Sequence, residues 1–454
     1  MIFRLLGLFM AGVMFDGFIT ILRFQAPGAL EPFIRFWKDL AVLSLLGGYA
    51  LCAIRAGGVR LAVPRALIVT WLILLGLGFI EFVVGQAQGT ADREQAIRAL
   101  RMHYQYPLFF ALFALPVCRL PTRMEENLFH GLGTIAPFIV AIGCSQAFLT
   151  EAWTNSSLVN AAVQAKSIDI RNFEGQFRPF GTFTSAFSFG HCCALITVYA
   201  VAHLLFHRRA NGFYWLLLPV SLAGLWVSTI RASILGSLAA VTYLVFVRLK
   251  VIQGIGIRFV VSSLLVAVCI ATPFVLAAQN EKHASKAVGY VNKSSLAERI
   301  DDEWTPAWVR LRSPADFIFG LGTGAIGGSI RDDRLGYFKY NAVDNYYLLV
   351  MVNHGILGIL VWAAFVFQLG WLIIRASMVA TEVTWFLHGT VALLVLGLGA
   401  SFFRMLLAAP PEAITTWVLL GLAAARAHEI LQRSPARSSH ASSPSAVLLA
   451  PAKA

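Results

Sequence analysis

The sequence predicts an all-α polytopic membrane protein with about twelve transmembrane helices. Of the 454 residues, 58% are hydrophobic and only 13% are charged, and the mean hydropathy is +0.72. A soluble domain with a charged surface does not reach these values. Apolar windows of about 17–25 residues, the length that crosses about 30 Å of hydrocarbon, recur along the chain. They cover residues 3–22, 39–54, 66–85, 103–118, 127–149, 181–206, 213–229, 231–249, 257–278, 352–374, 383–403 and 411–428.

Lysine and arginine gather in alternate connections between these windows, and the positive-inside rule assigns such connections to the cytoplasm. The residues concerned are Arg55, Arg60, Arg65, Arg119, Arg123, Arg208, Arg209, Arg248, Lys250, Arg258, Arg375, Arg426, Arg433 and Arg437. Both termini are therefore expected to be cytoplasmic. The net charge of +13 follows largely from this bias, so it does not indicate a nucleic-acid partner.

The two ends of the chain lead to separate expectations. The window 3–22 contains Asp16 and lacks an obvious small-residue cleavage site, so we expect a retained first helix and not a removed signal peptide. The six cysteines lie in or beside predicted helices, which favours neither disulfides nor a cysteine-based metal site. After the membrane domain, 1–428, the Ser-, Ala- and Pro-rich stretch 429–454 is expected to be a disordered cytoplasmic tail.

Two long connections on the outside, 150–180 and 280–343, interrupt the pattern of short loops. Long loops are uncommon unless they have a function. In the second loop, SLAERIDDEWTPAWVRL has the spacing of an amphipathic helix that lies on the membrane. FGLGTGAIGG is then a glycine-rich turn, and VDNYYLLVMVNHGILGIL returns to the bilayer. The two halves show no convincing internal repeat, which counts against a secondary transporter.

Three segments carry polar groups to the outside membrane boundary: EGQFRPFGTF with Arg178, STIRAS with Arg231, and VDNYY with Asp344. A guanidinium at the edge of a bilayer needs an anion, and its planar fork suits a diphosphate. Arg178 and Arg231 are therefore candidates for binding a lipid diphosphate. The alternative is that each only anchors a helix at the lipid phosphates.

Several other polar residues have two interpretations. Asp344 and Asn345 could orient a sugar hydroxyl and take its proton, or cap the following helix. The consecutive Asp301, Asp302 and Glu303 do not favour a metal site, because neighbouring carboxylates on a helix point in different directions. No metal and no cofactor are expected. Residues for which a surface or packing role is favoured are Arg171, Arg299, Arg310, Arg312 and the helical His191.

Taken in order along residues 170–375, the motifs RPFGTF, STIRAS, RIDDEW, FGLGTG and DNYYLLVMVNHGILG resemble those of the O-antigen ligase/polymerase superfamily. This resemblance implies a GT-C-like membrane glycosyltransferase of the bacterial inner membrane. Such enzymes use undecaprenyl-diphosphate glycans as donors at the periplasmic face without a metal. Arg178 and Arg231 match the arginines expected to bind the donor diphosphate, and Arg299 is a weaker match.

The resemblance also bears on the reaction. Asp344 stands where ligases of the superfamily commonly carry a histidine, which favours a polymerase of exopolysaccharide or O-antigen repeat units. In this hypothesis Arg231 and Arg178 stabilise the departing diphosphate, and Asp344, or Glu174 as a second choice, accepts the proton. Residues expected to contact the substrate are Arg171, Glu174, Arg299, Trp304, Trp308, Asn345, Tyr346 and Tyr347.

Two alternatives remain beside the polymerase. An O-antigen ligase would transfer the glycan to lipid A core and so make lipopolysaccharide. A flippase for lipid-linked oligosaccharides would form no bond and would need charged residues along a central path. The expected partners are the undecaprenyl-diphosphate-linked glycan and membrane lipid, and a chain-length regulator would be a further one.

Overall fold

Long apolar helices dominate the computed structural model, as the sequence predicts. Among the residues that it describes, nine helices are long and apolar enough to cross a membrane. The structure describes residues 2–23, 30–89, 96–97, 99–100, 105–117, 120–164, 172–173, 176–207, 211–280, 296, 299–326, 343–380, 383–403 and 412–433. The chain is thus a multi-pass helical membrane protein.

The nine long helices are α4 (Trp37–Arg55), α5 (Arg65–Gln88), α8 (Met124–Phe148), α11 (Ala186–Phe206), α13 (Arg231–Arg248), α14 (Ile255–Asn280), α18 (Tyr346–Val379), α19 (Thr384–Ser401) and α20 (Glu412–Arg433). Shorter helices are α1 (Ile2–Met14), α2 (Asp16–Arg23), α3 (Glu31–Arg35), α7 (Leu108–Ala114), α9 (Thr150–Thr154), α10 (Ser157–Gln164), α12 (Gly212–Ser228), α16 (Thr305–Val309) and α17 (Pro314–Phe319). Two short strands, β1 (Asn172–Phe173) and β2 (Gln176–Phe177), pair antiparallel in the first long loop.

Three predicted windows differ from straight spans, which accounts for the difference between twelve and nine. The first is broken into α1 and α2, which meet at 70°. In the described part of the window 103–118, residues 105–117, the helix is α7, whose rise of about 10 Å cannot cross a bilayer. Pro116 limits α7, because the residue before a proline avoids the helical region. Helix α12 rises about 26 Å and falls just short of a full span.

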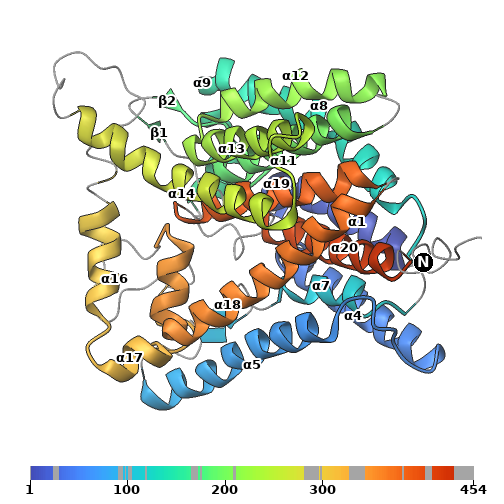
Figure 1. The fold of residues 1–454 in the computed structure, drawn as a ribbon. Helices are drawn as coiled ribbons and strands as arrows, with labels where there is room; N and C mark the ends of the chain where they lie inside the picture. The colour runs from blue at the N-terminus through green and yellow to red at the C-terminus, as the bar shows by residue number, and fades with distance from the viewer. Residues whose placement is uncertain are drawn as a thin grey trace, which may run out of the picture.

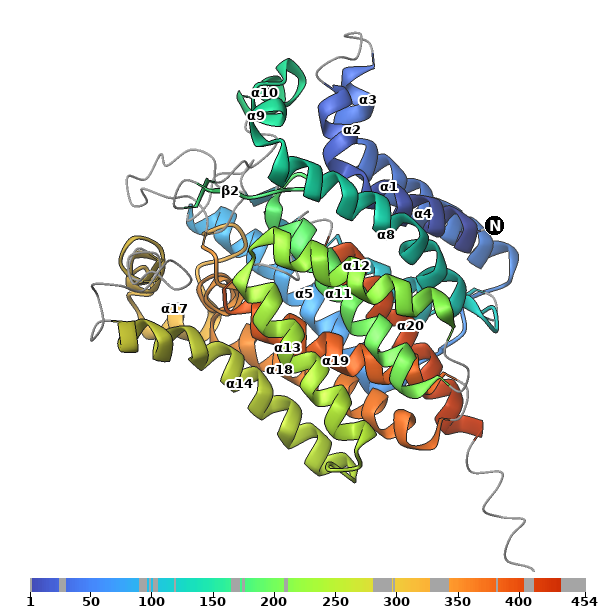
Figure 2. The ribbon, with the colours of Figure 1, turned by 90° about the horizontal axis from the view of Figure 1, so that it is seen from above.

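Burial separates central helices from peripheral ones. In α11, α19 and α20, 78%, 83% and 78% of the apolar window is buried inside the protein, and α11 packs against α12, α13 and α19. The corresponding figures for α14 and α4 are only 6% and 11%. Seen from above, these two helices lie along opposite edges of the bundle (Figure 2). Their exposed apolar faces suit a lipid surrounding, in which backbone groups are satisfied within each helix.

The two ends of the bundle differ in character. The N-terminus and the end of α20 lie at one end, and β1, β2, α16 and α17 lie at the other (Figure 1). At the N-terminal end, Arg258 at the start of α14 donates a hydrogen bond of 3.4 Å to Ser377 near the end of α18. The same end holds the start of α8 and the end of α20, which a buried cluster of charges joins.

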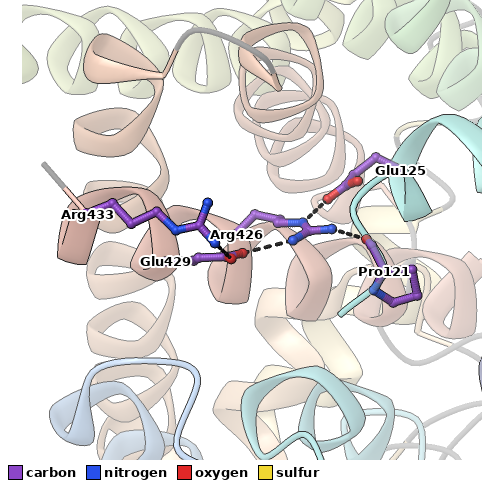
Figure 3. A network of polar contacts seen from close by, with 5 residues as sticks. All are labelled: Pro121, Glu125, Arg426, Glu429 and Arg433. Carbon is purple, nitrogen blue, oxygen red and sulfur yellow. Dashed lines mark hydrogen bonds and ion pairs between the residues drawn. The ribbon is translucent and has the colours of Figure 1, made fainter. Parts of the chain in front are cut away.

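Arg426 is the centre of that cluster (Figure 3). Its guanidinium donates to the Glu125 carboxylate and to the carbonyl of Pro121, and a third hydrogen bond of 2.8 Å goes to Glu429. The side chains of Glu125 and Arg426 are only 1% and 7% exposed. Because several hydrogen bonds satisfy the guanidinium, the desolvation of this ion pair is largely offset, and the pair locks α8 to α20.

The break between α1 and α2 holds the loop that precedes α11. The N–H of Gly17 donates to the carbonyl of Thr182 at 2.8 Å, and the Thr182 hydroxyl donates to the carbonyl of Met14. A Cβ at Gly17 would collide with the Phe183 carbonyl, so only glycine permits this approach. At the break, Thr182 therefore supplies hydrogen-bond partners for backbone groups that would otherwise bond within the helix.

The buried Gln146 of α8 fixes the same loop from the other side. Its Oε1 accepts hydrogen bonds of 2.9 and 2.8 Å from the N–H groups of Phe180 and Gly181, and its Nε2 donates to the Gly181 carbonyl at 2.9 Å. The side chain thus completes the backbone hydrogen bonds of a segment that has no secondary structure. The segment 178–185 is consequently held in place at the C-terminal end of α8.

The second long loop and the C-terminal stretch also refine the sequence predictions. The expected amphipathic helix is a π-helical turn, Arg299–Trp304, followed directly by α16. Pro306 contributes to this change, because it has no N–H for an ordinary helical hydrogen bond. Helix α20 extends to Arg433, beyond the expected start of the tail at 429, and residues 434–454 lie outside the described residues.

We predict that replacing Arg426 with methionine lowers the free energy of unfolding by about 3–5 kcal/mol, the cost of leaving a buried carboxylate without its cation. Denaturant unfolding of the purified protein in detergent micelles would measure the loss. Arg433→Met is the matched control, because Arg433 also pairs with Glu429 but is 77% exposed. An exposed pair contributes at most about 1 kcal/mol. Equal losses of unfolding free energy in the two variants would therefore contradict the role of Arg426 in joining α8 to α20.

We also predict that Gln146→Leu loosens the segment 178–185. The leucine has a similar volume but leaves two N–H groups and one carbonyl without partners, at about 1–3 kcal/mol each. Hydrogen–deuterium exchange of that segment should become faster, while the exchange of α11 stays slow. Gln253→Leu serves as the control, because Gln253 is exposed and donates only to a nearby carbonyl. Unchanged exchange in 178–185 would refute the anchoring role.

Candidate functional site

The three segments that the sequence singles out lie at the same end of the bundle. Helix α11 begins at this end, directly after the loop that contains Arg178. Helix α13 begins there with Arg231, and α18 begins there after Asp344. Helix α19 ends there, and its last turns contact both neighbours. Gly236 of α13 packs on Leu396 of α19, and the Tyr347 hydroxyl donates to the Leu398 carbonyl at 2.7 Å. The end of α19 therefore links the first turns of α13 and α18.

Arg231 occupies the first position of α13, after a very short connection from α12. The reversal depends on Thr229, whose φ of 53° is left-handed and costly for a β-branched residue. Ile230 precedes the helix and provides no side-chain cap. The N-terminal N–H groups of a helix and its dipole favour an anion, so the half-buried Arg231 adds a full positive charge where the helix end already carries a partial one.

Arg178 lies at the start of the segment that Gln146 and Gly17 hold in place. Its side chain is partly buried, as is that of Arg231. Both arginines therefore stand on anchored backbone, which limits the conformational entropy lost when either of them binds an anion. Arg171 and Glu174, which belong to the same predicted loop, lie outside the described residues.

Asp344 and Asn345 form the head of α18. Asn345 caps the helix by accepting a hydrogen bond of 3.0 Å from the N–H of Leu348, so the capping interpretation holds for this residue. The Asp344 carboxylate lies 3.6 Å from the guanidinium of Arg299, and its N–H donates to Glu303 at 3.2 Å. The π-helical turn thus orients Asp344, and Arg299 contacts this carboxylate instead of standing alone at the surface.

The aromatic residues expected to stack on sugars are mostly part of the core. Tyr346 is 9% exposed and packs near Trp362, with ring centroids 5.8 Å apart. Tyr347 meets the same tryptophan edge-on at 5.6 Å. Trp304 packs against Phe402 at 5.4 Å. These rings support the head of α18 from within, because edge-to-face contacts fix their orientation.

Trp308 and the neighbouring helix α17 form the outer part of the loop. Trp308 is 48% exposed and meets Phe317 of α17 edge-on at 5.6 Å. Helix α17 begins with a capping box, in which Ser313 and Asp316 satisfy each other's backbone N–H groups. Slight burial raises the pKa of Asp316. The hydrogen bonds from the backbone N–H groups of Ser313 and Arg312 lower this pKa by more, so it lies below its usual value.

The glycine-rich segment 320–326 is a turn, as the sequence predicts, and it docks onto two helices. Gly320, Gly322 and Gly324 have φ values of 74°, 96° and 93°, a region that glycine alone adopts readily. The N–H of Leu321 donates to the Val352 carbonyl at 2.8 Å, and that of Gly322 to the Asn353 carbonyl at 3.0 Å. The turn is therefore a part of the packing around α18.

A buried pair of ionisable residues lies beneath this turn, and the sequence analysis did not single it out. Nδ1 of His354 on α18 contacts Oε2 of Glu81 on α5 within hydrogen-bonding range. Glu81 is 5% exposed and His354 9%. The signal in the sequence was a single carboxylate inside the apolar window 66–85, because ionisable residues within a span are rarely incidental.

His191 faces a second buried feature, a small cavity between α1, α8, α11 and α20 with room for about one water molecule. Its wall is mostly apolar and also includes Glu412, the first residue of α20. The lining residues are Met14, Leu132, Ile139, Phe183, Ser188, His191, Cys192, Leu195, Ile196, Glu412 and Thr415. A site of this size is too small for a sugar.

In the acidic run of the second loop, the structure describes the side chains of Asp301 and Glu303. Asp301 is exposed, and Glu303 contacts the backbone of Asp344. Throughout the part of the chain that the structure describes, no three His, Cys, Asp or Glu side chains gather in a way that could hold a metal ion. The charged groups near the head of α18 instead pair with one another.

No family model matches this chain, and no curated protein is significantly similar to it in sequence.

Proposed function

We propose that this membrane protein is a polymerase of exopolysaccharide or O-antigen repeat units, which transfers a glycan from undecaprenyl diphosphate to another lipid-linked repeat unit. One observation carries the proposal: Arg231 stands at the uncapped N-terminus of α13, at the same end of the bundle as Arg178 and the head of α18. Two cations and a carboxylate at one end of the bundle suit a lipid diphosphate and an acceptor hydroxyl. The ordered sequence motifs support the same function.

The distribution of charge supports an orientation for this site. Basic residues such as Arg55, Arg248 and Arg426 lie at the end of the bundle opposite to Arg231. By the positive-inside rule, that end would face the cytoplasm. The candidate site would then face the periplasm across the inner membrane, where lipid-linked repeat units are polymerised.

The proposed reaction is a displacement at the anomeric carbon of the donor sugar. The acceptor hydroxyl oxygen forms a bond to that carbon, and the bond from the carbon to the diphosphate oxygen breaks. Undecaprenyl diphosphate leaves with the bonding electrons, and Arg231 and Arg178 stabilise its growing negative charge. Asp344 accepts the hydroxyl proton. Arg299 holds this carboxylate in place, and Glu303 accepts a hydrogen bond from the backbone N–H of Asp344. No metal takes part in the proposed step.

Arg231→Ala should reduce chain extension about 10²–10³-fold, the usual cost of removing one group that stabilises transition-state charge. The extension rate of Arg231→Lys should lie between those of Arg231→Ala and the wild type, because lysine keeps the charge but not the planar fork. The measurement is glycan length in the native host after deletion of the gene and complementation with each variant. Arg312→Ala is the matched control, since Arg312 is an exposed arginine at the same end.

The same experiment separates the polymerase from its alternatives. A polymerase defect leaves single repeat units where long chains are expected. Long chains stranded on the undecaprenyl carrier would show a ligase, and repeat units trapped on the cytoplasmic leaflet would show a flippase. A correctly inserted Arg231→Ala protein that extends chains at the normal rate would exclude the diphosphate role.

Asp344→Asn should reduce the extension rate about 10²-fold or more, because general base catalysis contributes about 10²–10⁴-fold. The amide keeps the size of the side chain and can still bond to neighbours, so insertion and thermal stability should stay close to wild type. Asp301→Asn is the control, since Asp301 is an exposed carboxylate on the adjoining π-helical turn. If both variants extend chains equally well, Asp344 is not the base.

A further inference from the structure

Helix α18 is two helical segments joined at a break. Gly355 has φ 61° and ψ −166° inside the helix, values far from helical geometry. The break interrupts the regular ladder near the carbonyls of Val352 and Asn353. These carbonyls accept hydrogen bonds of 2.8 and 3.0 Å from the turn 320–326. The segment before the break, 343–354, is called the head segment below, and it carries Asp344 at its tip.

The turn is attached to the head segment by more than these two bonds. Asn353 brackets the backbone of Ile326, accepting from its N–H at 3.2 Å and donating to its carbonyl at 3.4 Å. A Cβ at Gly355 would collide with the carbonyl of Ile318 at the end of α17. Arg310 also donates to the carbonyl of Ala325. The turn and the head segment therefore form one packed unit.

Helix α5 runs alongside this break and contacts α18 on both sides of it. Beyond the break, Gln368 donates to the hydroxyl of Thr70 at 2.9 Å. Before the break, Glu81 contacts His354, the last residue of the head segment. Thr323 of the turn also binds α5, through a hydrogen bond of 2.9 Å to the Gly78 carbonyl. Helix α5 is thus bonded to α18 on both sides of the break.

The chemistry of the Glu81–His354 contact suits a fixed orientation. A carboxylate that bonds to one ring nitrogen of histidine sets the orientation of the ring. Both side chains are nearly excluded from water. A polar contact in such a buried place is strong when it is made and costly when it is broken. The contact lies at the base of the head segment, and Asp344 lies at its tip.

We propose that the Glu81–His354 pair is the positioning element of the candidate site: it sets the angle of the head segment across the Gly355 break and so places Asp344 relative to Arg231. The inference rests on the proposed function, because Asp344 matters for a reaction only there. Arg231 belongs to α13, which reaches the head segment through the last turns of α19. The pair acts on the acceptor side and does not touch the donor diphosphate.

The first test compares variants of the pair with a matched control on the same two helices. Glu81→Ala should lower chain extension per folded protein about tenfold or more, since a misplacement of about 1 Å can cost 10²-fold. Binding of undecaprenyl diphosphate to the detergent-solubilised protein should stay at the wild-type level. The exchanged pair, Glu81→His with His354→Glu, should recover part of the rate. The control replaces two residues that are each 60% exposed, Ile80→Ala on α5 and Leu360→Ala on α18, and should leave the rate unchanged.

The second test does not depend on any reaction. In Glu81→Ala, hydrogen–deuterium exchange should become faster in the turn 320–326 and the head segment, and stay as in wild type in 178–185 and the first turns of α13. Faster exchange in all four regions would show a general structural role and overturn the proposal. A folded Glu81→Ala protein with normal exchange and normal extension would overturn it as well.

The two tests separate this inference from the proposed function. If the wild-type protein neither binds undecaprenyl diphosphate nor extends chains in the native host, the proposed function fails. The exchange pattern still decides whether the pair controls the head segment. If the wild type binds the lipid and extends chains but Glu81→Ala does so equally well, the positioning role fails while the proposed function stands.

Discussion

The constraint on which the candidate site depends is that an interrupted helix in an apolar surrounding must find other partners for its backbone groups. Within the described ranges, two helices are interrupted, at the α1–α2 junction and at Gly355 of α18. In the first break, Thr182 binds Gly17 and the Met14 carbonyl. In the second, the turn 320–326 binds the freed carbonyls of α18. Each break is therefore also a docking point for a loop.

Both docked segments lie at the same end of the bundle, and together they frame the candidate site (Figure 1). One begins with Arg178, and the other supports the head of α18 with Asp344. Because the loops are bonded to helix backbone and not only to each other, they share the rigidity of the bundle. The buried pair Glu81–His354 extends this principle, since α5 bridges the break to which the turn is bonded. Preorganisation of this kind is what a site for charged groups requires.

Part of the site was predictable from local sequence, and part was not. The sequence indicated Arg178, Arg231 and Asp344, because charged residues at the ends of apolar windows stand out. It also predicted the glycine-rich turn. It could not show that Arg299 pairs with Asp344, nor that Tyr346 packs inside the core, because both facts depend on which distant segments meet. Glu81 and His354 are 273 residues apart in the chain, so no local pattern links them.

By itself, the sequence determined that the chain is a multi-pass helical membrane protein. A stretch of about 20 apolar residues is a local property of the sequence, and it is long enough to cross the hydrocarbon core of a bilayer as a helix. It also placed most helices within a few residues. The tertiary structure decided where helices break, as between α1 and α2 and at Gly355, because a break is stable only when a remote segment supplies its hydrogen bonds. It likewise decided that Arg426 locks α8 to α20. Such pairings are set by packing between helices, which the order of residues along one helix does not specify.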